Sequence, residues 1–229
     1  MSSRICGNLV VRLATLFSLD LNSVRLPQAF DTPPLRSTMN AILPFPELRS
    51  QRFILRQILQ GDLRALYEGL SDPRVNAHYG ISYQSEQATQ EQIDWYRGLE
   101  NDGNGVWWAI CAHHHPQQLL GACGVYEIDH YNRNADIGYW LSPAQWGQGV
   151  MQECLTKVFE YAFGNMQLHR LEAEVEIENI ASRKLLEKLG FEHEGRRRQV
   201  SWRGERYVDL DYFGLLTPHR VKPTSGLTG

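Results

Sequence analysis

Apolar residues recur at helical spacing in four segments of the chain. The clearest segment has one broad stripe, made of Val150, Met151, Cys154, Leu155, Val158, Phe159 and Ala162, as in a helix that buries one face. A second helix is predicted between Asn179, a residue type favoured at the N-cap, and Gly190, which suits the position after a helix end. A shorter stripe predicts a helix over 63–70, with Asp72-Pro73 as the end of helical structure. Another predicts a helix over 85–99, with Ser85 as N-cap.

Alternation of apolar and polar residues predicts the strands. It is strict from Leu171 to Ile177, which indicates a strand with one buried and one solvated face. Further strands are predicted at 48–56, 106–112, 119–128, 135–141, 195–202 and 205–215. Strands and helices therefore mix in one unit, and the predicted fold class is α+β (α/β mixed), with a twisted mixed sheet of about seven strands flanked by about four helices.

Composition excludes several classes of protein. With 229 residues, 42% of them hydrophobic and 21% charged, the chain suits one soluble domain with a sizeable core. No apolar run approaches the roughly 20 residues of a membrane helix. The formal net charge of -3 argues against a protein that coats nucleic acid. We therefore expect neither a membrane nor direct nucleic acid as a partner.

Cysteine and histidine spacing gives no sign of a metal site. The cysteines are scattered without a CxxC pair, at Cys6, Cys111, Cys123 and Cys154. They are expected to be reduced thiols, as in the cytoplasm. The run His113-His114-His115 is interpreted as a solvated hairpin turn, because adjacent residues rarely converge on one ion and no second cluster completes the coordination.

The first 38 residues differ from the remainder in composition. They contain several arginines and serines, few acids and the loop-like run Asp31–Pro34. We interpret 1–38 as a disordered or non-native extension, with Met39 as an alternative start; a transit peptide is the other interpretation. One folded domain is expected over 39–217, followed by a flexible tail over 218–229.

A glycine-rich turn opens the best predicted helix. It reads Trp146-Gly147-Gln148-Gly149-Val150 and directly follows a predicted strand. Glycines let backbone N–H groups point outward without a Cβ in the way. Together with the positive end of the helix, these donors can bind an anion such as a pyrophosphate. The turn lacks the full patterns of a P-loop or a dinucleotide fold, and a tight turn that merely needs two glycines is the alternative.

Five segments in this order resemble the GNAT acetyltransferase superfamily, and within it the RimJ/RimL type of protein N-terminal acetyltransferases. They are LRSQRFILR (48–56), SDPRV (71–75), ADIGYWL (135–141), WGQGVMQE (146–153) and NIASRKLLEKLGF (179–191). The resemblance spans roughly Leu48 to Leu216. It implies a single GNAT-type domain whose sheet is splayed open between Ile137–Leu141 and Leu171–Ile177. Acetyl-CoA would lie in the gap as co-substrate, and no metal is implied.

The resemblance also implies roles for individual residues. Backbone amides of the turn would hold the CoA pyrophosphate, at Trp146, Gly147, Gln148, Gly149 and Val150. The strand with Ile137, Tyr139 and Leu141 would pair with the pantetheine arm, and Asn179 would hydrogen-bond to it. Many relatives have a tyrosine where Leu186 falls here, as proton donor to the leaving thiolate. In the RimJ/RimL branch a serine of an NxxS pattern is the proposed donor, which points to Ser182.

The chemistry of amide formation indicates a general base. An amine attacks a thioester only when it is unprotonated, and free amines are mostly charged at neutral pH. Asp136 is the first candidate, because it lies on the strand that would flank the thioester; Glu127 and Asp129 are next. A solvated or hydrogen-bonded carboxylate at a strand edge is the alternative interpretation of each.

The predicted function is direct acetyl transfer from acetyl-CoA to a primary amine, by a cytoplasmic monomer or homodimer. By resemblance, the favoured acceptor is the N-terminal α-amine of a protein. A small-molecule amine such as an amino acid, a polyamine or an aminoglycoside stays open, with His78, Tyr79 and Tyr83 as residues that could line its pocket. A non-catalytic acyl-CoA-binding module is the rival, supported by the missing hydroxyl at Leu186.

Overall fold

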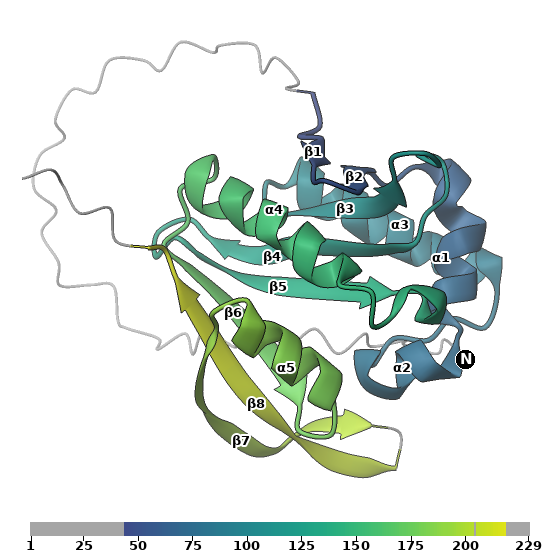
Figure 1. The fold of residues 1–229 in the computed structure, drawn as a ribbon. Coiled ribbons are helices and arrows are strands. Elements are labelled where there is room, and N and C mark those ends of the chain that lie inside the picture. Colours follow the sequence, from purple (N-terminus) through teal and green to yellow (C-terminus); the bar gives the residue numbers. More distant parts are fainter. Residues whose placement is uncertain (1–43, 204, 219–229) are drawn as a thin grey trace, which may run out of the picture. The chain divides into compact units, whose positions relative to one another are not determined.

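The chain forms one mixed sheet of eight strands in the order β1-β2-β3-β4-β5-β6-β8-β7 (Figure 1). This computed structural model describes residues 44–203 and 205–218. The strands are β1 (Leu48–Arg49), β2 (Phe53–Gln57), β3 (Gly105–Ala112), β4 (Gly121–Asp129), β5 (Asn134–Leu141), β6 (Arg170–Glu176), β7 (Glu192–Arg203) and β8 (Arg206–Leu216). The helices are α1 (Leu63–Leu70), α2 (Pro73–Tyr79), α3 (Glu86–Asn101), α4 (Val150–Gly164) and α5 (Ile180–Lys188).

The predicted fold class is confirmed, and with two exceptions its segments occur where the patterns place them. The extension predicted over 1–38, the alternative start at Met39 and residues 219–229 of the predicted tail lie outside the described residues. In the part of the chain that the structure describes, no helix is both long enough and apolar enough to cross a membrane.

Two elements differ from the prediction. The strand predicted at 48–56 is a hairpin of two strands, because Ser50 forms a turn in which its Oγ accepts from the N–H of Phe53 at 3.0 Å. A fifth helix, α2, begins where Asp72-Pro73 was expected to end helical structure. Asp72 instead caps α2, since its side chain accepts from the N–H of Arg74. Proline is tolerated in the first turn, where its missing N–H has no intrahelical partner to lose.

Different helices cover the two faces of the sheet (Figure 1). On one face the apolar stripe of α4 packs with Leu186 of α5 and with inward residues of β6, which include Leu171, Ala173 and Val175. On the other face α1, α2 and α3 pack with β3, β4 and Trp140 of β5. Because side chains alternate along a strand, Ile137 and Tyr139 of β5 lie on the α4–α5 face and Trp140 on the α1–α3 face.

The sheet opens between β5 and β6. These parallel strands form only three residue pairs within the described chain, Asn134–Arg170, Ala135–Leu171 and Asp136–Glu172. Past that point β5 continues to pair with β4 as far as Leu141, while β6 pairs with β8 as far as Glu176. Figure 1 shows the two strands diverging from their paired ends. The facing edges therefore carry backbone groups to which an extended ligand could add like a strand.

Candidate functional site

The turn before α4 has the backbone geometry of an anion site. Gly147 and Gly149 have φ of 73° and 72°, in the left-handed region that glycine adopts at little cost. Residues 146–149 are exposed, and Gly149 is the N-cap of α4 with no side chain that caps the helix. The N–H groups of the first helical turn and the positive helix end are therefore available to a negatively charged group.

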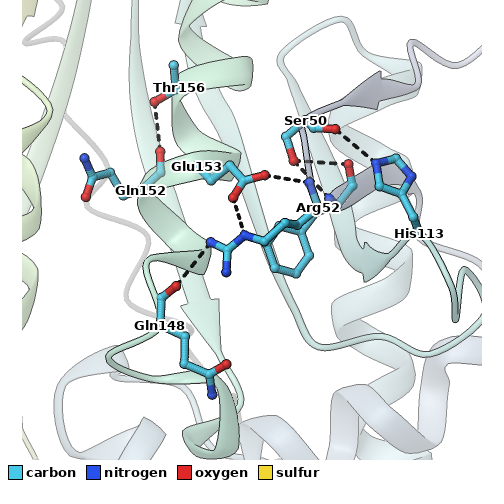
Figure 2. A network of polar contacts seen from close by, with 8 residues as sticks. Ser50, Arg52, His113, Gln148, Gln152, Glu153 and Thr156 are labelled. Atoms are coloured by element: carbon cyan, nitrogen blue, oxygen red, sulfur yellow. Dashed lines mark hydrogen bonds and ion pairs between the residues drawn. The ribbon is translucent and has the colours of Figure 1, made fainter.

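Arg52 places a cation beside this turn (Figure 2). It comes from the loop between β1 and β2. Its Nε donates to Glu153 Oε2 at 2.7 Å, its backbone N–H donates to Oε1 of the same carboxylate at 2.8 Å, and its Nη2 donates to the carbonyl of Gln148 at 3.1 Å. Burial alone would raise the pKa of Glu153, but the hydrogen bonds from Arg52 and Ser50 lower it below its usual value. Arg52 thus holds the turn and the first turn of α4 together.

The histidine run beside this network contacts the backbone. Nε2 of His113 lies 3.0 Å from the carbonyl oxygen of Ser50 (Figure 2). The backbone N–H of His113 donates to the carbonyl of Arg52. Among residues 44–203 and 205–218, no group of three or more His, Cys, Asp or Glu side chains is arranged to hold a metal ion.

Two hydroxyl groups meet in the opening of the sheet. The phenol of Tyr139 on β5 and Oγ of Ser182 on α5 are 2.5 Å apart, and either can donate. Burial raises the pKa of Tyr139 to about 12, despite the hydrogen bond to Ser182, which lowers it. The phenol is therefore protonated near neutral pH. The sequence predicted a role only for the backbone of Tyr139. It did not predict the side-chain contact with Ser182, which lies 43 positions later.

Leu186 lies one helical turn after Ser182 on α5 and has an apolar side chain. Its side chain is fully buried in the core between α4, α5 and the sheet. Residue 186 of this chain therefore contributes to the packing of the core and supplies no hydroxyl. The phenol of Tyr139 lies instead on the facing strand, next to Ser182.

Asn179 ties α5 to the end of β6. Its side-chain oxygen accepts from the N–H of Ser182 at 3.1 Å, so the predicted N-cap is confirmed. Its own N–H donates to the carbonyl of Glu176 at 2.9 Å. Gly190 follows the C-cap of the same helix with φ of 89°, as its sequence position predicts. The short connection between β6 and α5 thereby fixes Ser182 relative to the strand end.

The carboxylates selected as candidate bases lie near the closed end of the opening. Asp136 occupies the last pair of the β5–β6 ladder, opposite Glu172. Glu127 sits in an irregularity of β4 with φ of 52°. Burial chiefly raises the pKa of Tyr126, and the charges of Asp136 and Glu127 raise it further, so both carboxylates are close to that phenol.

Asp129, the third candidate base, is held in a turn. Its carboxylate accepts from the backbone N–H groups of Asn132 at 2.8 Å and Tyr131 at 2.9 Å. The hydrogen bonds from Asn132 are the main reason why the pKa of Asp129 lies below its ordinary value. This geometry corresponds to the alternative interpretation, a hydrogen-bonded carboxylate beside a strand end.

A buried ion-pair group lies at the far end of β6. Glu176 is 5% exposed; Arg203 donates to its Oε1, and Nδ1 of His78 lies 3.2 Å from its Oε2. Gly80, with φ of 76°, ends α2 beside this group, and a Cβ there would lie 2.6 Å from Nη1 of Arg203. The backbone of α2 can approach the guanidinium so closely because residue 80 has no side chain.

The other aromatic residues of this segment face elsewhere. Tyr79 packs against the core of the α1–α3 face, and the hydroxyl of Tyr83 donates to Gln92 at 2.9 Å. A cavity of about 170 Å³ lies next to the buried group and is lined by Glu176, Ile177, Glu178, Arg206, Tyr207, Val208 and Asp209. His78, Tyr79 and Tyr83 were predicted as possible residues of an acceptor pocket. Of these, His78 contacts Glu176, which lines the cavity.

Comparisons with known proteins agree with this architecture. The family described as acetyltransferase (GNAT) domain matches residues 52–192. The uncharacterized N-acetyltransferase YoaA of Bacillus subtilis is 31% identical over 175 residues, which cover 76% of this chain and 98% of the relative. The ribosomal-protein-serine acetyltransferase of Escherichia coli is 21% identical, over 73% of this chain and 94% of the relative. Spermidine N-acetyltransferase from Vibrio cholerae, solved with CoA and spermine, has a TM-score of 0.64 at 22% identity, over 72% and 95% of the two chains.

Proposed function

The chain belongs to the GNAT acetyltransferase family and is an N-acetyltransferase, and from this premise we propose that it transfers the acetyl group of acetyl-CoA to the N-terminal α-amine of a protein. The observation that carries the proposal is the opening between β5 and β6. It leads from the hydroxyl pair of Tyr139 and Ser182 along the free edge of β5 to the glycine turn.

The residues along this path fit a CoA thioester. The amides from Trp146 through Gly147, Gln148 and Gly149 to Val150, with the helix end behind them, suit a pyrophosphate. The free edge of β5 at Ile137, Tyr139 and Leu141 suits the amide groups of the pantetheine arm, which would add like a strand. Asn179 would hydrogen-bond to the same arm from the other side of the opening.

Proton transfer in this scheme uses the groups that flank the opening. Ser182, hydrogen-bonded to Tyr139, would protonate the departing sulfur. For removal of the amine proton, Asp136 and Glu127 remain the proposed carboxylates, because both lie at the closed end of the opening. A direct attack needs no covalent intermediate on the enzyme, so no nucleophilic side chain is required.

A polyamine is the second candidate acceptor. Side chains alternate along β6, which places Glu172, Glu174 and Glu176 on the face opposite the apolar residues of that strand. Arginines lie beside each of these carboxylates, so an acceptor with several positive charges would have to exchange with them. A structural neighbour was solved with spermine. The α-amine is favoured because the resemblance to the RimJ/RimL type extends over five segments of the chain.

The test is release of free CoA thiol by the purified protein. Acetyl-CoA is offered with a peptide that begins with serine, the same peptide with a blocked N-terminus, and spermidine. We expect release with the free peptide alone, and mass spectrometry should place the acetyl group on its first residue. Release with spermidine alone would replace the proposed acceptor. A protein that binds acetyl-CoA but acetylates no amine would be the non-catalytic module.

We also propose a reducing compartment, the cytoplasm, and a monomer or homodimer as the active form. Cys111, Cys123 and Cys154 are free and buried. Burial raises the pKa of Cys111 to about 11 and that of Cys154 to about 12, so these thiols are protonated and unreactive at neutral pH. Sedimentation of the purified protein would distinguish the two assembly states.

A further inference from the structure

Glu176 is a buried carboxylate whose two oxygens have different partners. The carboxylate side chain is 4% exposed, and its Oε1 accepts from Arg203, which belongs to β7. Its Oε2 lies 3.2 Å from Nδ1 of His78, which belongs to α2. A buried charge is tolerated only when it is paired in this way. Arg203 compensates the charge, and the second oxygen is left to orient the imidazole.

The imidazole of His78 is partly open to solvent. Its side chain is 33% exposed, and among the described residues no hydrogen-bond partner of Nε2 is found. An imidazole that donates its Nδ1–H to a carboxylate has the lone pair of Nε2 free to accept a proton. The charged groups around the ring are Glu176 and Glu178 at the end of β6, Arg203 of β7 and, paired with Glu178, Arg206 of β8.

The position of α2 brings this imidazole to the opening of the sheet. α2 packs against β5, while its His78 reaches Glu176 on β6. It therefore connects the two strands that diverge, on the α1–α3 face (Figure 1). Ser182 and Tyr139 lie on the opposite, α4–α5 face. The β6–α5 connection links both sides, because Asn179 bonds to the backbone of Glu176 and caps the turn that holds Ser182.

We propose that His78, in place of Asp136 and Glu127, takes the proton from the acceptor amine, with Glu176 as the positioning residue that orients its ring. This proposal rests on the proposed acetyl transfer and assigns a residue to the acceptor side of that same site. It also places the incoming amine on the α1–α3 face, next to the cavity between Glu176, Glu178 and Tyr207. The acetyl donor then occupies the opening between the proton acceptor and the hydroxyl pair.

The protons and electrons balance in this arrangement. The acceptor, as R–NH₃⁺, gives one proton to Nε2 of His78. The nitrogen lone pair forms the bond to the thioester carbon, and the C–S bond breaks with its electron pair on sulfur. Sulfur takes a proton from the pair Ser182–Tyr139. Nitrogen then loses its second proton, which passes through water and reprotonates that pair. The imidazolium finally releases its proton to solvent, so one amide, one thiol and one proton result.

The experiment compares His78→Ala with a histidine variant elsewhere in the same chain. His114 is exposed in the turn between β3 and β4, so His114→Gln is the control. Turnover is measured as CoA thiol release with the serine peptide and with spermidine. We expect His78→Ala to lower kcat about 100-fold or more, with the acetyl-CoA KM within about twofold, and added imidazole to restore about tenfold.

Two further variants separate orientation from folding. His78→Gln keeps a side chain that can hydrogen-bond to Glu176, and it is used if His78→Ala does not fold. Glu176→Gln keeps the size of the residue and should lower kcat about tenfold, as expected when a supporting group is weakened. Thermal stabilisation by acetyl-CoA should persist in all variants, since none lies on the proposed cofactor path.

The outcomes are distinct. Retained kcat in His78→Ala and His78→Gln would overturn the proposal, and so would a loss that imidazole does not reduce, since that pattern indicates a purely structural role. A wild-type protein that releases no CoA with either acceptor would instead overturn the proposed function on which this inference rests.

Discussion

The half of the site assigned to acetyl-CoA and the half assigned to the amine are assembled from different parts of the chain. The first consists mainly of one continuous stretch, in which β5 leads through the glycine turn into α4. The second joins His78 to Glu176, 98 positions later, and Glu176 to Arg203 of β7. A cofactor site of the first kind is recognisable in sequence, whereas an acceptor site of the second kind depends on tertiary packing.

The two halves also differ in charge. The cofactor half presents a helix N-terminus with Arg52 beside it, which suits phosphate groups. The acceptor half contains a buried carboxylate held by an arginine, Glu176 by Arg203. The opening therefore has an electropositive end and an end with a compensated buried carboxylate, which matches a phosphorylated donor and an amine acceptor.

The hydroxyl pair between the halves should give the largest effect. Ser182→Ala is expected to lower kcat about 10³-fold, because the thiolate then leaves without its proton donor. Tyr139→Phe should reduce kcat as well, and the double variant should be little worse than Ser182→Ala, because both hydroxyls act in one path. Steady-state thiol release measures this. Thr156→Ala, which removes a hydroxyl bonded within α4, is the control; equal losses there would contradict the assignment.

Asp211 of β8 is expected to govern the stability of the packing of α5 and β7 on β8. Its side chain is 0% exposed between Arg196, Arg183 and His193, so Asp211→Asn should destabilise folding by about 3 kcal/mol. Urea unfolding measures the loss. The hydrogen bond from Arg196 is the main reason why the pKa of Asp211 lies below 3.8. Stability from this group is therefore present above about pH 4 and is lost as the pH falls below it.

The control for Asp211→Asn is a surface carboxylate. Asp94 is 62% exposed and lies 3.8 Å from Arg97, so Asp94→Asn should change stability by less than about 0.5 kcal/mol. If Asp211→Asn behaves like this control, the buried carboxylate does not hold α5 and β7 on β8.

The glycine turn should give a smaller effect that is confined to the cofactor half. A Cβ at residue 147 would meet nothing within 4 Å, so Gly147→Ala strains only the backbone, by about 1–2 kcal/mol. We expect acetyl-CoA to bind about tenfold more weakly, measured by titration calorimetry. Gly164→Ala at the end of α4, also without a neighbour within 4 Å, should bind normally. Equal affinities for both variants would exclude the turn as the binding element.

Arg52 should give the smallest effect. Its side chain is 48% exposed, so Arg52→Gln is expected to weaken acetyl-CoA binding by at most about 1 kcal/mol, and less at high salt because exposed charges are screened. Binding measured at low and high ionic strength checks this. Arg49→Gln, which removes a 63% exposed arginine, is the matched control and should show neither a loss nor a change in salt dependence.

Sequence patterns predicted what is determined locally. Asn179 and Ser85 cap helices because an N-cap depends on neighbouring residues. The position of the opening at Ile137–Leu141 followed from the family resemblance and agrees with the strand pairing. The helix α2 was missed because Asp72-Pro73 was taken as a stop, although aspartate followed by proline equally begins a helix.

The contacts that were missed are all long-range. Arg52 and Glu153 are 101 positions apart, and His78 and Glu176 are 98 apart. Neither pair has a local pattern, so each becomes visible only when the sheet brings its elements together. The contact between Tyr139 and Ser182 is similar, since strand alternation predicts the face on which Tyr139 lies but not its partner on α5.

The most direct test of the central claim, that the opening between β5 and β6 binds acetyl-CoA, is the thermal unfolding midpoint with and without this ligand. ATP and dephospho-CoA serve as comparison ligands. At 100 times its dissociation constant a ligand stabilises the folded state by about 2.7 kcal/mol, which raises the midpoint by roughly 5–10 °C for a chain of this size. We expect such a rise for acetyl-CoA and a smaller one for ATP. An unchanged midpoint at millimolar acetyl-CoA would contradict it.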